Sequence, residues 1–410
     1  MLGVPLGDDI FVAGFVEKKL LGRLLSTVNC LVEFEDTQAA SYLLRVSFSI
    51  VRAVHFMRTT PLTQWLEQAA KFDKMIRKAI EQILGFPMSD PVFAQACLTP
   101  RLGGLGLRKV TEHANLAFHA SWHESKLTCK ENWNPPPELE PEYKSQKQAS
   151  FEFDQTMHAF LVGNADVREA QRLRRSAQPH ACGFITAVPS DEDGKDALLR
   201  PRNFRIAVAY RLGVPVLNEE TPCPLCKQPI NVFGDHATCC TKEGDIIIRH
   251  NSLRNLVNSI ATDAQLSPVM EKKGILGNTS GRRPGDVTLE QWAEGKGLAI
   301  DVAVTSPLAQ TCVRLVEPCE DYAATRKHAK YDASFEGTNY FFSAMVFETL
   351  GAVNTEGEEV LKQLFRFASK RLGHEFTSYC GRAWARISCN LQRSVAQAIL
   401  SRIDGKEHFS

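Results

Sequence analysis

The 410-residue sequence contains no apolar run that approaches the length of a membrane span, for which about 20 consecutive apolar residues are needed. No secretory signal pattern opens it, and its twelve cysteines do not form the framework of a disulfide-stapled domain. These absences predict an intracellular protein in a reducing setting, without a membrane partner.

An excess of charge is also lacking, because the formal net charge is only +1. Binding to nucleic acid must therefore come from local basic patches rather than from a global field. Residues 168–175 (REAQRLRR) form one such run. We interpret it as a solvated helix face in preference to a DNA contact.

Two aspartates lie on a predicted β-hairpin. Residues 287–292 (VTLEQW) alternate apolar with polar, 293–297 (AEGKG) have turn chemistry, and 298–304 are rich in β-formers. Asp286 then starts one strand and Asp301 lies in the middle of the next. A carboxylate inside an apolar strand is unfavourable unless it is compensated, and a divalent cation shared by the two acids would do so. The alternative is a strand aspartate that faces solvent at a sheet edge.

This arrangement resembles the PD-(D/E)xK core of restriction endonucleases. Pro284, Gly285 and Asp286 stand for the "PD" and Asp301 for the second acid. The lysine usually found two positions after the second acid would fall at Ala303, which has no amine. The resemblance therefore implies that a lysine from a neighbouring element takes its place.

Residues 317–331 (EPCEDYAATRKHAKY) predict a helix with Pro318 in its first turn and two lysines, Lys327 and Lys330, on one face. Two solvated lysines are the alternative interpretation. The KxxKY pattern made with Tyr331 is similar to that of the restriction-like endonuclease of site-specific non-LTR retrotransposons, whose lysine lies on a helix. By this resemblance Lys327 is the first candidate for the catalytic amine and Lys330 the second.

Upstream, a CxxC pair (Cys223 and Cys226) is followed by His236 and Cys240 at the spacing of a structural zinc site. Cys239 is the alternate fourth ligand. Buried apolar cysteines are the alternative to a metal site, and a disulfide is disfavoured in a reducing setting.

The same retrotransposon proteins carry a CCHC knuckle just before the endonuclease, followed by a segment similar to Arg249, His250, Asn251 and Arg254. Residues 246–260 (IIIRHNSLRNLVNSI) predict a helix with an apolar stripe and with these basic groups on another side. Arg249, His250 and Arg254 are therefore candidates for nucleic-acid binding, with a solvated face as the alternative.

Glu271 lies in a short extended stretch between this helix and the hairpin. The resemblance implies an upstream acid here, so Glu271 is a candidate third carboxylate. The alternative is a surface charge beside Lys272 and Lys273.

The first third of the chain resembles the thumb of a non-LTR retrotransposon reverse transcriptase through the segments MLGVPLGDDIFVAGF, PLTQWL and QACLTPRLGGLGLR. A helical stripe from Phe72 to Ile83, closed by Gly85, predicts a helical bundle. The aromatic-x-Asp-Asp motif of a polymerase is missing from the sequence, so the chain is not expected to be a reverse transcriptase on its own. We expect it to be the C-terminal portion of a longer product, read from an internal methionine.

The predicted fold is therefore mixed: an all-α thumb-like bundle, a zinc knuckle and an α/β restriction-endonuclease-like domain. The expected divisions are the thumb-like region (1–130), a linker (131–150), a helical connector (151–215), the knuckle with its basic helix (216–262) and the nuclease domain (263–410). The proline-rich residues 132–148 mark the linker.

The expected function is DNA nicking by a nuclease in which Asp286 and Asp301 bind magnesium or manganese and Lys327 assists. Zinc would be structural, DNA the target, retrotransposon RNA a further partner, and the nucleus the compartment implied by the resemblance. The alternative is a zinc-knuckle nucleic-acid-binding fragment without catalytic activity. A structural fragment that depends on the missing palm is a third interpretation.

Overall fold

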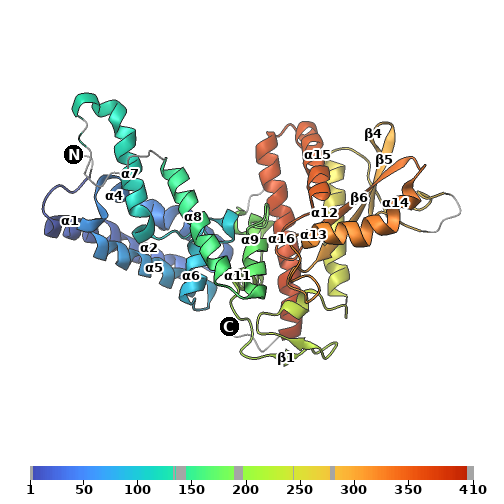
Figure 1. The fold of residues 1–410 in the computed structure, drawn as a ribbon, viewed down its shortest axis with the longest axis horizontal. Helices are drawn as coiled ribbons and strands as arrows, with labels where there is room; N and C mark the ends of the chain where they lie inside the picture. The colour runs from blue at the N-terminus through green and yellow to red at the C-terminus, as the bar shows by residue number, and fades with distance from the viewer. Residues whose placement is uncertain are drawn as a thin grey trace. The chain divides into compact units, whose positions relative to one another are not determined.

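The structure is a computed structural model that describes residues 3–132, 134, 145–188, 197–242, 244–277 and 282–403. The chain divides into two compact units between Asn164 and Ala165 (Figure 1). Each unit is described below by itself. Most of the predicted linker lies outside the described residues.

Unit 1 is helical, as the sequence predicts for the N-terminal region. Its helices are α1 (Asp9–Val16), α2 (Gly22–Val32), α3 (Thr37–Leu43), α4 (Val54–Thr59), α5 (Leu66–Leu84), α6 (Asp90–Cys97), α7 (Val110–Cys129) and α8 (Gln146–Gly163). Two π-helical turns (Glu17–Leu21 and Leu44–Phe48) and 3-10 turns (Ile50–Arg52, Leu62–Gln64, Pro100–Leu102 and Lys130–Asn132) join them.

Helix α5 forms because its apolar residues recur at helical spacing, and Phe72, Ile76 and Ile80 of this stripe are buried. The helix ends where Gly85 takes a left-handed conformation (φ 77°) and its N–H bonds to the Glu81 carbonyl at 2.8 Å. The predicted stripe and its glycine C-cap are both confirmed.

Helix α8 belongs to unit 1. Its buried Asp154 accepts hydrogen bonds from Arg108 Nε at 3.0 Å and Nη2 at 2.7 Å, and from the backbone N–H of Thr99 at 3.3 Å. The stretch expected to be a separate connector (151–215) is therefore divided: α8 packs with α7, and the remainder folds with unit 2.

Unit 2 combines helices with two small sheets. Its helices are α9 (Val167–Ser176), α10 (Gly183–Thr186), α11 (Pro201–Leu212), α12 (Asp245–Asp263), α13 (Pro318–Tyr322), α14 (Ala329–Phe335), α15 (Thr355–Leu372) and α16 (Phe376–Ile403). A 3-10 turn, η8 (Asp235–Thr238), and a π-helical segment, η9 (Ala323–His328), complete the helical part. Its strands are β1 (Thr221–Pro222), β2 (Pro229–Ile230), β3 (Val269–Met270), β4 (Val287–Ala293), β5 (Lys296–Thr305) and β6 (Tyr340–Glu348).

The larger sheet has the order β3-β4-β5-β6. Strands β4 and β5 form the predicted antiparallel hairpin, whose turn places Glu294 and Gly295 at positive φ. Strand β6 pairs with β5 in parallel, so the chain must cross over between them, and it does so through α13, η9 and α14. This crossover carries both candidate lysines.

The two faces of this sheet are covered by different helices. Ala303 of β5 and its β6 neighbour Val346 pack against Cys319 of α13 and Ala323 of η9, so the crossover lies on their face. Gly357 of α15 packs instead against Met345, which points to the opposite face. Small residues on β5 thus let the crossover helix approach the strand closely.

Three of the four arginines of α9 have partners within unit 2, and only Arg174 is exposed. Arg168 donates to both carboxylate oxygens of Asp235 at 2.6 and 2.8 Å, and Arg175 donates to both oxygens of buried Glu348 at 2.8 and 2.9 Å. Arg172 is fully buried and bonds to a backbone carbonyl of α11. The interpretation of this run as a solvated helix face is therefore wrong for these three arginines, because each has a partner far away in the sequence.

Among the described residues, no helix combines the length and the hydropathy required of a membrane span.

Candidate functional site

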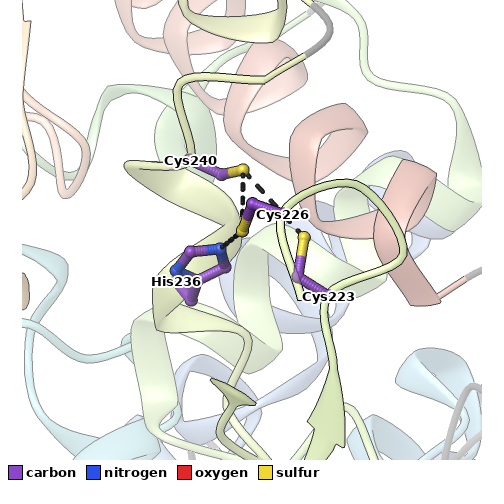
Figure 2. A group of neighbouring side chains, drawn as sticks. All are labelled: Cys223, Cys226, His236 and Cys240. Carbon is purple, nitrogen blue, oxygen red and sulfur yellow. Dashed lines mark hydrogen bonds between the residues drawn. The ribbon is translucent and has the colours of Figure 1, made fainter. Parts of the chain in front are cut away.

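Four potential metal ligands converge in unit 2 between α11 and α12, as Figure 2 shows. Cys223 and Cys226 lie in the tight turn between β1 and β2, whereas His236 and Cys240 come from η8 and the residue pair after it. All four ligand atoms lie within 4.8 Å of one another.

The sulfur–sulfur distances suit a tetrahedral metal ion. Cys226 Sγ lies 3.0 Å from His236 Nε2 and 3.7 Å from Cys240 Sγ, and Cys223 Sγ lies 4.0 Å from Cys240 Sγ. Thiolates bound at 2.3 Å in tetrahedral geometry are about 3.8 Å apart. Cys239 is not part of the group, because its thiol points to the carbonyls of Asp235 and His236. The group can therefore hold a metal such as zinc.

Local electrostatics favour the ligand forms of Cys223 and His236, whereas burial and the neighbouring thiols raise the pKa of Cys226. Burial opposes ionisation of the Cys223 thiol, but the backbone N–H groups of Cys226 and Leu225 outweigh it and lower its pKa. Burial, together with Arg402, lowers the pKa of His236 and keeps its ring neutral. Neutral imidazole and thiolate are the forms that bind metal.

The second cluster begins with Asp286 and Asp301. Asp286 precedes the Val287–Ile300 pair of the hairpin and so lies opposite Asp301. Its backbone N–H bonds to the Ile300 carbonyl at 2.8 Å, and its Oδ2 accepts the N–H of Val302 at 2.7 Å. The Asp286 carboxylate thus accepts a backbone N–H of β5 just beyond the last residue at which β4 pairs with this strand.

Lys327 completes this cluster from η9. Its Nζ donates to both carboxylate oxygens of Asp301 at 2.9 Å. Lys330, one turn further along, is exposed, and its Nζ lies 4.6 Å from the centre of the Tyr331 ring. Of the two candidate lysines, the structure brings Lys327 to the strand carboxylate. Its segment is π-helical, a feature often found at functional sites.

The two acids have opposite pKa shifts. Burial and the charge of Asp286 raise the pKa of Asp301 to about 6, although Lys327 acts in the opposite direction. Burial also opposes ionisation of Asp286, but His250 and the Val302 N–H outweigh it and lower its pKa. The carboxyl groups are close enough to share a hydrogen bond. A pair of carboxyl groups of this kind can lose its proton when a cation binds between them.

His250 belongs to this cluster and is not on a separate basic face. Its Nε2 lies 3.1 Å from Asp286 Oδ1, and this bond raises the pKa of the imidazole. Sequence spacing gave no signal for the contact, because it depends on how α12 packs against the hairpin.

Glu271 and Arg254 are paired with each other. Arg254 donates to Glu271 Oε1 at 2.6 Å, and Arg283 bonds to the other oxygen. The Glu271 backbone N–H meets the Asp286 carbonyl at 3.0 Å, so the residue is adjacent to the acids, but its carboxylate is occupied by two guanidinium groups. Among the described residues, no third potential ligand atom lies within 4.8 Å of both Asp286 and Asp301 in the way that the Cys3His group requires.

Arg249, the remaining candidate for nucleic-acid binding, is buried. Its side chain is 2% exposed, and its Nη2 donates to the Thr238 carbonyl at 2.9 Å. It therefore lies on an inner face of α12 and not with the solvated basic groups that the sequence predicted.

The chain matches no protein-family model and no curated protein. The functional argument therefore depends on the two clusters themselves.

Proposed function

We propose that unit 2 is a metal-dependent DNA endonuclease that nicks its target by phosphodiester hydrolysis. The observation that carries this proposal is the contact of Lys327 Nζ with both oxygens of Asp301, beside the Asp286 carboxylate. Two acids and a lysine are the groups that the PD-(D/E)xK pattern requires. Here the lysine comes from a helix, as in the restriction-like endonuclease of non-LTR retrotransposons.

The donor set fits magnesium or manganese, because both favour carboxylate oxygens. Asp286 and Asp301 would hold the cation, which lowers the pKa of a bound water and stabilises charge on the phosphate. Lys327 must first release Asp301, since it occupies both of its oxygens. The freed ammonium can then orient the attacking water or stabilise the negative charge that develops on the phosphate. His250 keeps the Asp286 carboxylate in place.

We further propose that the Cys3His group binds zinc and has a structural role. Four ligands leave no open position for a substrate, as in other closed zinc sites. The site would support a surface that approaches DNA, and retrotransposon RNA is a second candidate partner.

The test is incubation of the full-length protein with supercoiled plasmid and magnesium or manganese. We expect relaxed circles from the wild type, and a loss of about 100-fold or more in Asp301→Asn and Lys327→Met. Lys330→Met is the matched control, since this lysine is exposed, and it should keep its activity within a factor of about three. Loss of activity in Lys330→Met but not in Lys327→Met would transfer the catalytic role to Lys330.

The alternative, a nucleic-acid-binding module without catalytic activity, is favoured by the Cys3His group and by the absence of a third acid beside Asp286 and Asp301 among the described residues. It predicts a wild-type protein that shifts DNA in a gel and leaves supercoiled plasmid intact with either metal. That result would replace the endonuclease proposal.

A further inference from the structure

Two arginines converge on one carboxylate beside the proposed metal site. Arg254 donates from Nη1 to Glu271 Oε1 at 2.6 Å, and Arg283 bonds to the other carboxylate oxygen through its own Nη1. The three residues come from different elements: α12, the turn after β3 and the segment that leads into β4. We call Arg254 and Arg283 the guanidinium clamp.

The guanidinium clamp is held close to Asp286. The backbone N–H of Glu271 bonds to the Asp286 carbonyl at 3.0 Å, and Arg283 is three residues before Asp286 in the chain. On α12, Arg254 is one turn after His250, whose Nε2 lies 3.1 Å from Asp286 Oδ1. Four residues of an α-helix advance about 6 Å, so the clamp is adjacent to the acids.

The clamp carries two positive charges against the single negative charge of Glu271, and it is open to solvent. The side chains of Glu271 and Arg283 are 40% and 47% exposed. The Nε and Nη2 groups of Arg283 make no hydrogen bond to another residue among those that the structure describes. Because an ion pair this exposed contributes little to stability, another anion can displace the carboxylate at low cost.

Arg254 is oriented before any ligand binds. Its Nε and Nη2 donate to Asn255 Oδ1 at 3.2 and 3.1 Å, which leaves Nη1 directed at the carboxylate. Glu271 has a left-handed backbone conformation (φ 48°), which is uncommon for residues other than glycine and is found preferentially at functional sites. Convergence of guanidinium groups on one anion is also how arginine binds phosphate.

We propose that the guanidinium clamp binds a backbone phosphate of duplex DNA, and that Glu271 is an internal substitute which this phosphate displaces. The inference rests on the proposed function, because the adjacent acids would bring the DNA to the clamp. Each phosphate of a strand occupies 3.4 Å of the duplex axis, so a separation of about 6 Å corresponds to about two nucleotides. The bound phosphate would thus fix the position of the strand that is cut.

The test measures binding of a labelled DNA duplex to the full-length protein without magnesium or manganese, so that no strand is cut. At about 100 mM salt, Arg254→Gln and Arg283→Gln should each lower the affinity about 10-fold and reduce the salt slope by about one. The loss should be equal for duplexes of unrelated sequence, since a phosphate carries no sequence information. Arg174→Gln, at an exposed arginine of α9, is the matched control.

Displacement of the carboxylate has its own test. Glu271→Gln should bind DNA about 5-fold more tightly, because the competing charge is gone. Glu290→Gln is the matched control: Glu290 is 44% exposed and pairs with Lys272, so it also loses one ion-paired negative charge from the same sheet. It should change the affinity by less than about 2-fold. The gain in Glu271→Gln should disappear when it is combined with Arg283→Gln.

Two results would overturn the clamp. One is wild-type affinity in both arginine variants, and Arg283→Gln remains informative if Arg254→Gln does not fold, because Arg283 is exposed. The other is an equal gain in Glu271→Gln and Glu290→Gln. A wild type that does not nick plasmid, with weakened binding in the arginine variants, would remove the endonuclease and support the clamp. Plasmid nicking with unchanged binding in those variants would remove the clamp alone.

Discussion

The ion pair between Lys327 and Asp301 is the contact on which the proposed function depends. Both side chains are largely buried, with exposures of 17% and 10%. Removal of the lysine leaves the Asp301 carboxyl group without its cation and beside the Asp286 carboxylate.

We expect Lys327→Met to lower the free energy of unfolding by about 3 kcal/mol, the magnitude seen when one partner of a buried ion pair is removed. Lys330→Met should change it by less than about 0.5 kcal/mol, since Lys330 is exposed. Urea unfolding of both variants measures the difference. The double variant Asp301→Asn/Lys327→Met should recover part of the loss, and equal unfolding energies for the two lysine variants would contradict this account.

A buried histidine makes unit 1 sensitive to acid. Burial, with a contribution from Arg108, lowers the pKa of His113 to about 3. Asp154 Oδ1 lies 3.6 Å from the ring, but this carboxylate is already paired with Arg108 and does not hold the imidazole charged. His113 is therefore neutral in the folded protein at neutral pH.

Because this pKa is lower in the folded state than in the unfolded chain, the unfolded state binds the proton first as the pH falls. Stability is thus lost between about pH 6.5 and pH 3, by up to roughly 4 kcal/mol from this residue. Hydrogen exchange of α7 as a function of pH measures the effect. His113→Gln should reduce the pH dependence of stability between about pH 6.5 and pH 3. An unchanged slope of stability against pH would assign the acid sensitivity to other groups.

At the scale of elements, α9 connects parts of unit 2 that are far apart in the sequence. Arg168 contacts η8, which carries His236, while Arg175 contacts Glu348 at the end of β6. Helix α9 therefore connects η8, which carries one residue of the Cys3His group, with strand β6 of the larger sheet.

The neighbours Arg174 and Arg175 give a matched test of this role, because Arg174 is exposed and Arg175 is buried. Arg175→Met should lower the free energy of unfolding by about 3 to 5 kcal/mol, since it leaves the Glu348 charge buried and unpaired. Arg174→Met should have little effect. Chemical unfolding compares them, and partial recovery in Arg175→Met/Glu348→Gln is expected.

Local patterns predicted local elements well. The hairpin that carries Asp286 and Asp301 follows from alternation and a glycine turn, and α5 follows from helical spacing and its C-cap. Burial of Arg175 was not predictable in the same way, because its partner Glu348 is 173 residues away. Polar residues that pair over such distances look identical, in sequence, to residues of a solvated face.

The candidate sites likewise differ in how far local sequence patterns predict them. Cys223, Cys226, His236 and Cys240 are close in sequence, and their spacing indicates their convergence. Lys327 required a resemblance to a known family, since it reaches Asp301 only through the parallel pairing of β5 and β6. The pairing of Glu271 with Arg254, and the burial of Arg249, depend on tertiary packing that sequence spacing does not encode.

For the whole molecule, the division into two units predicts an unequal response to loss of the metal. All four ligands lie in unit 2, and η8 is bonded to α9 of the same unit. Chelation should therefore lower the midpoint of one thermal transition by roughly 10 °C, equivalent to about 4 kcal/mol for a unit of this size.

Two adjacent cysteine positions provide the control. Cys240→Ser should reduce the bound zinc and reproduce the chelated transition, whereas Cys239→Ser should retain the metal, because Cys239 is outside the group. Metal analysis and calorimetry measure both, and hydrogen exchange assigns the transition to a unit. A metal-free Cys239→Ser protein would instead make Cys239 a ligand.

The alanine at position 303 also limits which side chains the strand can carry beside Asp301. It is 6% exposed and packs against Cys319 and Ala323 of the crossover helix. A lysine there would have to displace that helix, and with it the residue that now contacts Asp301. An amine at strand position 303 and the present packing of the Lys327 segment are therefore sterically incompatible.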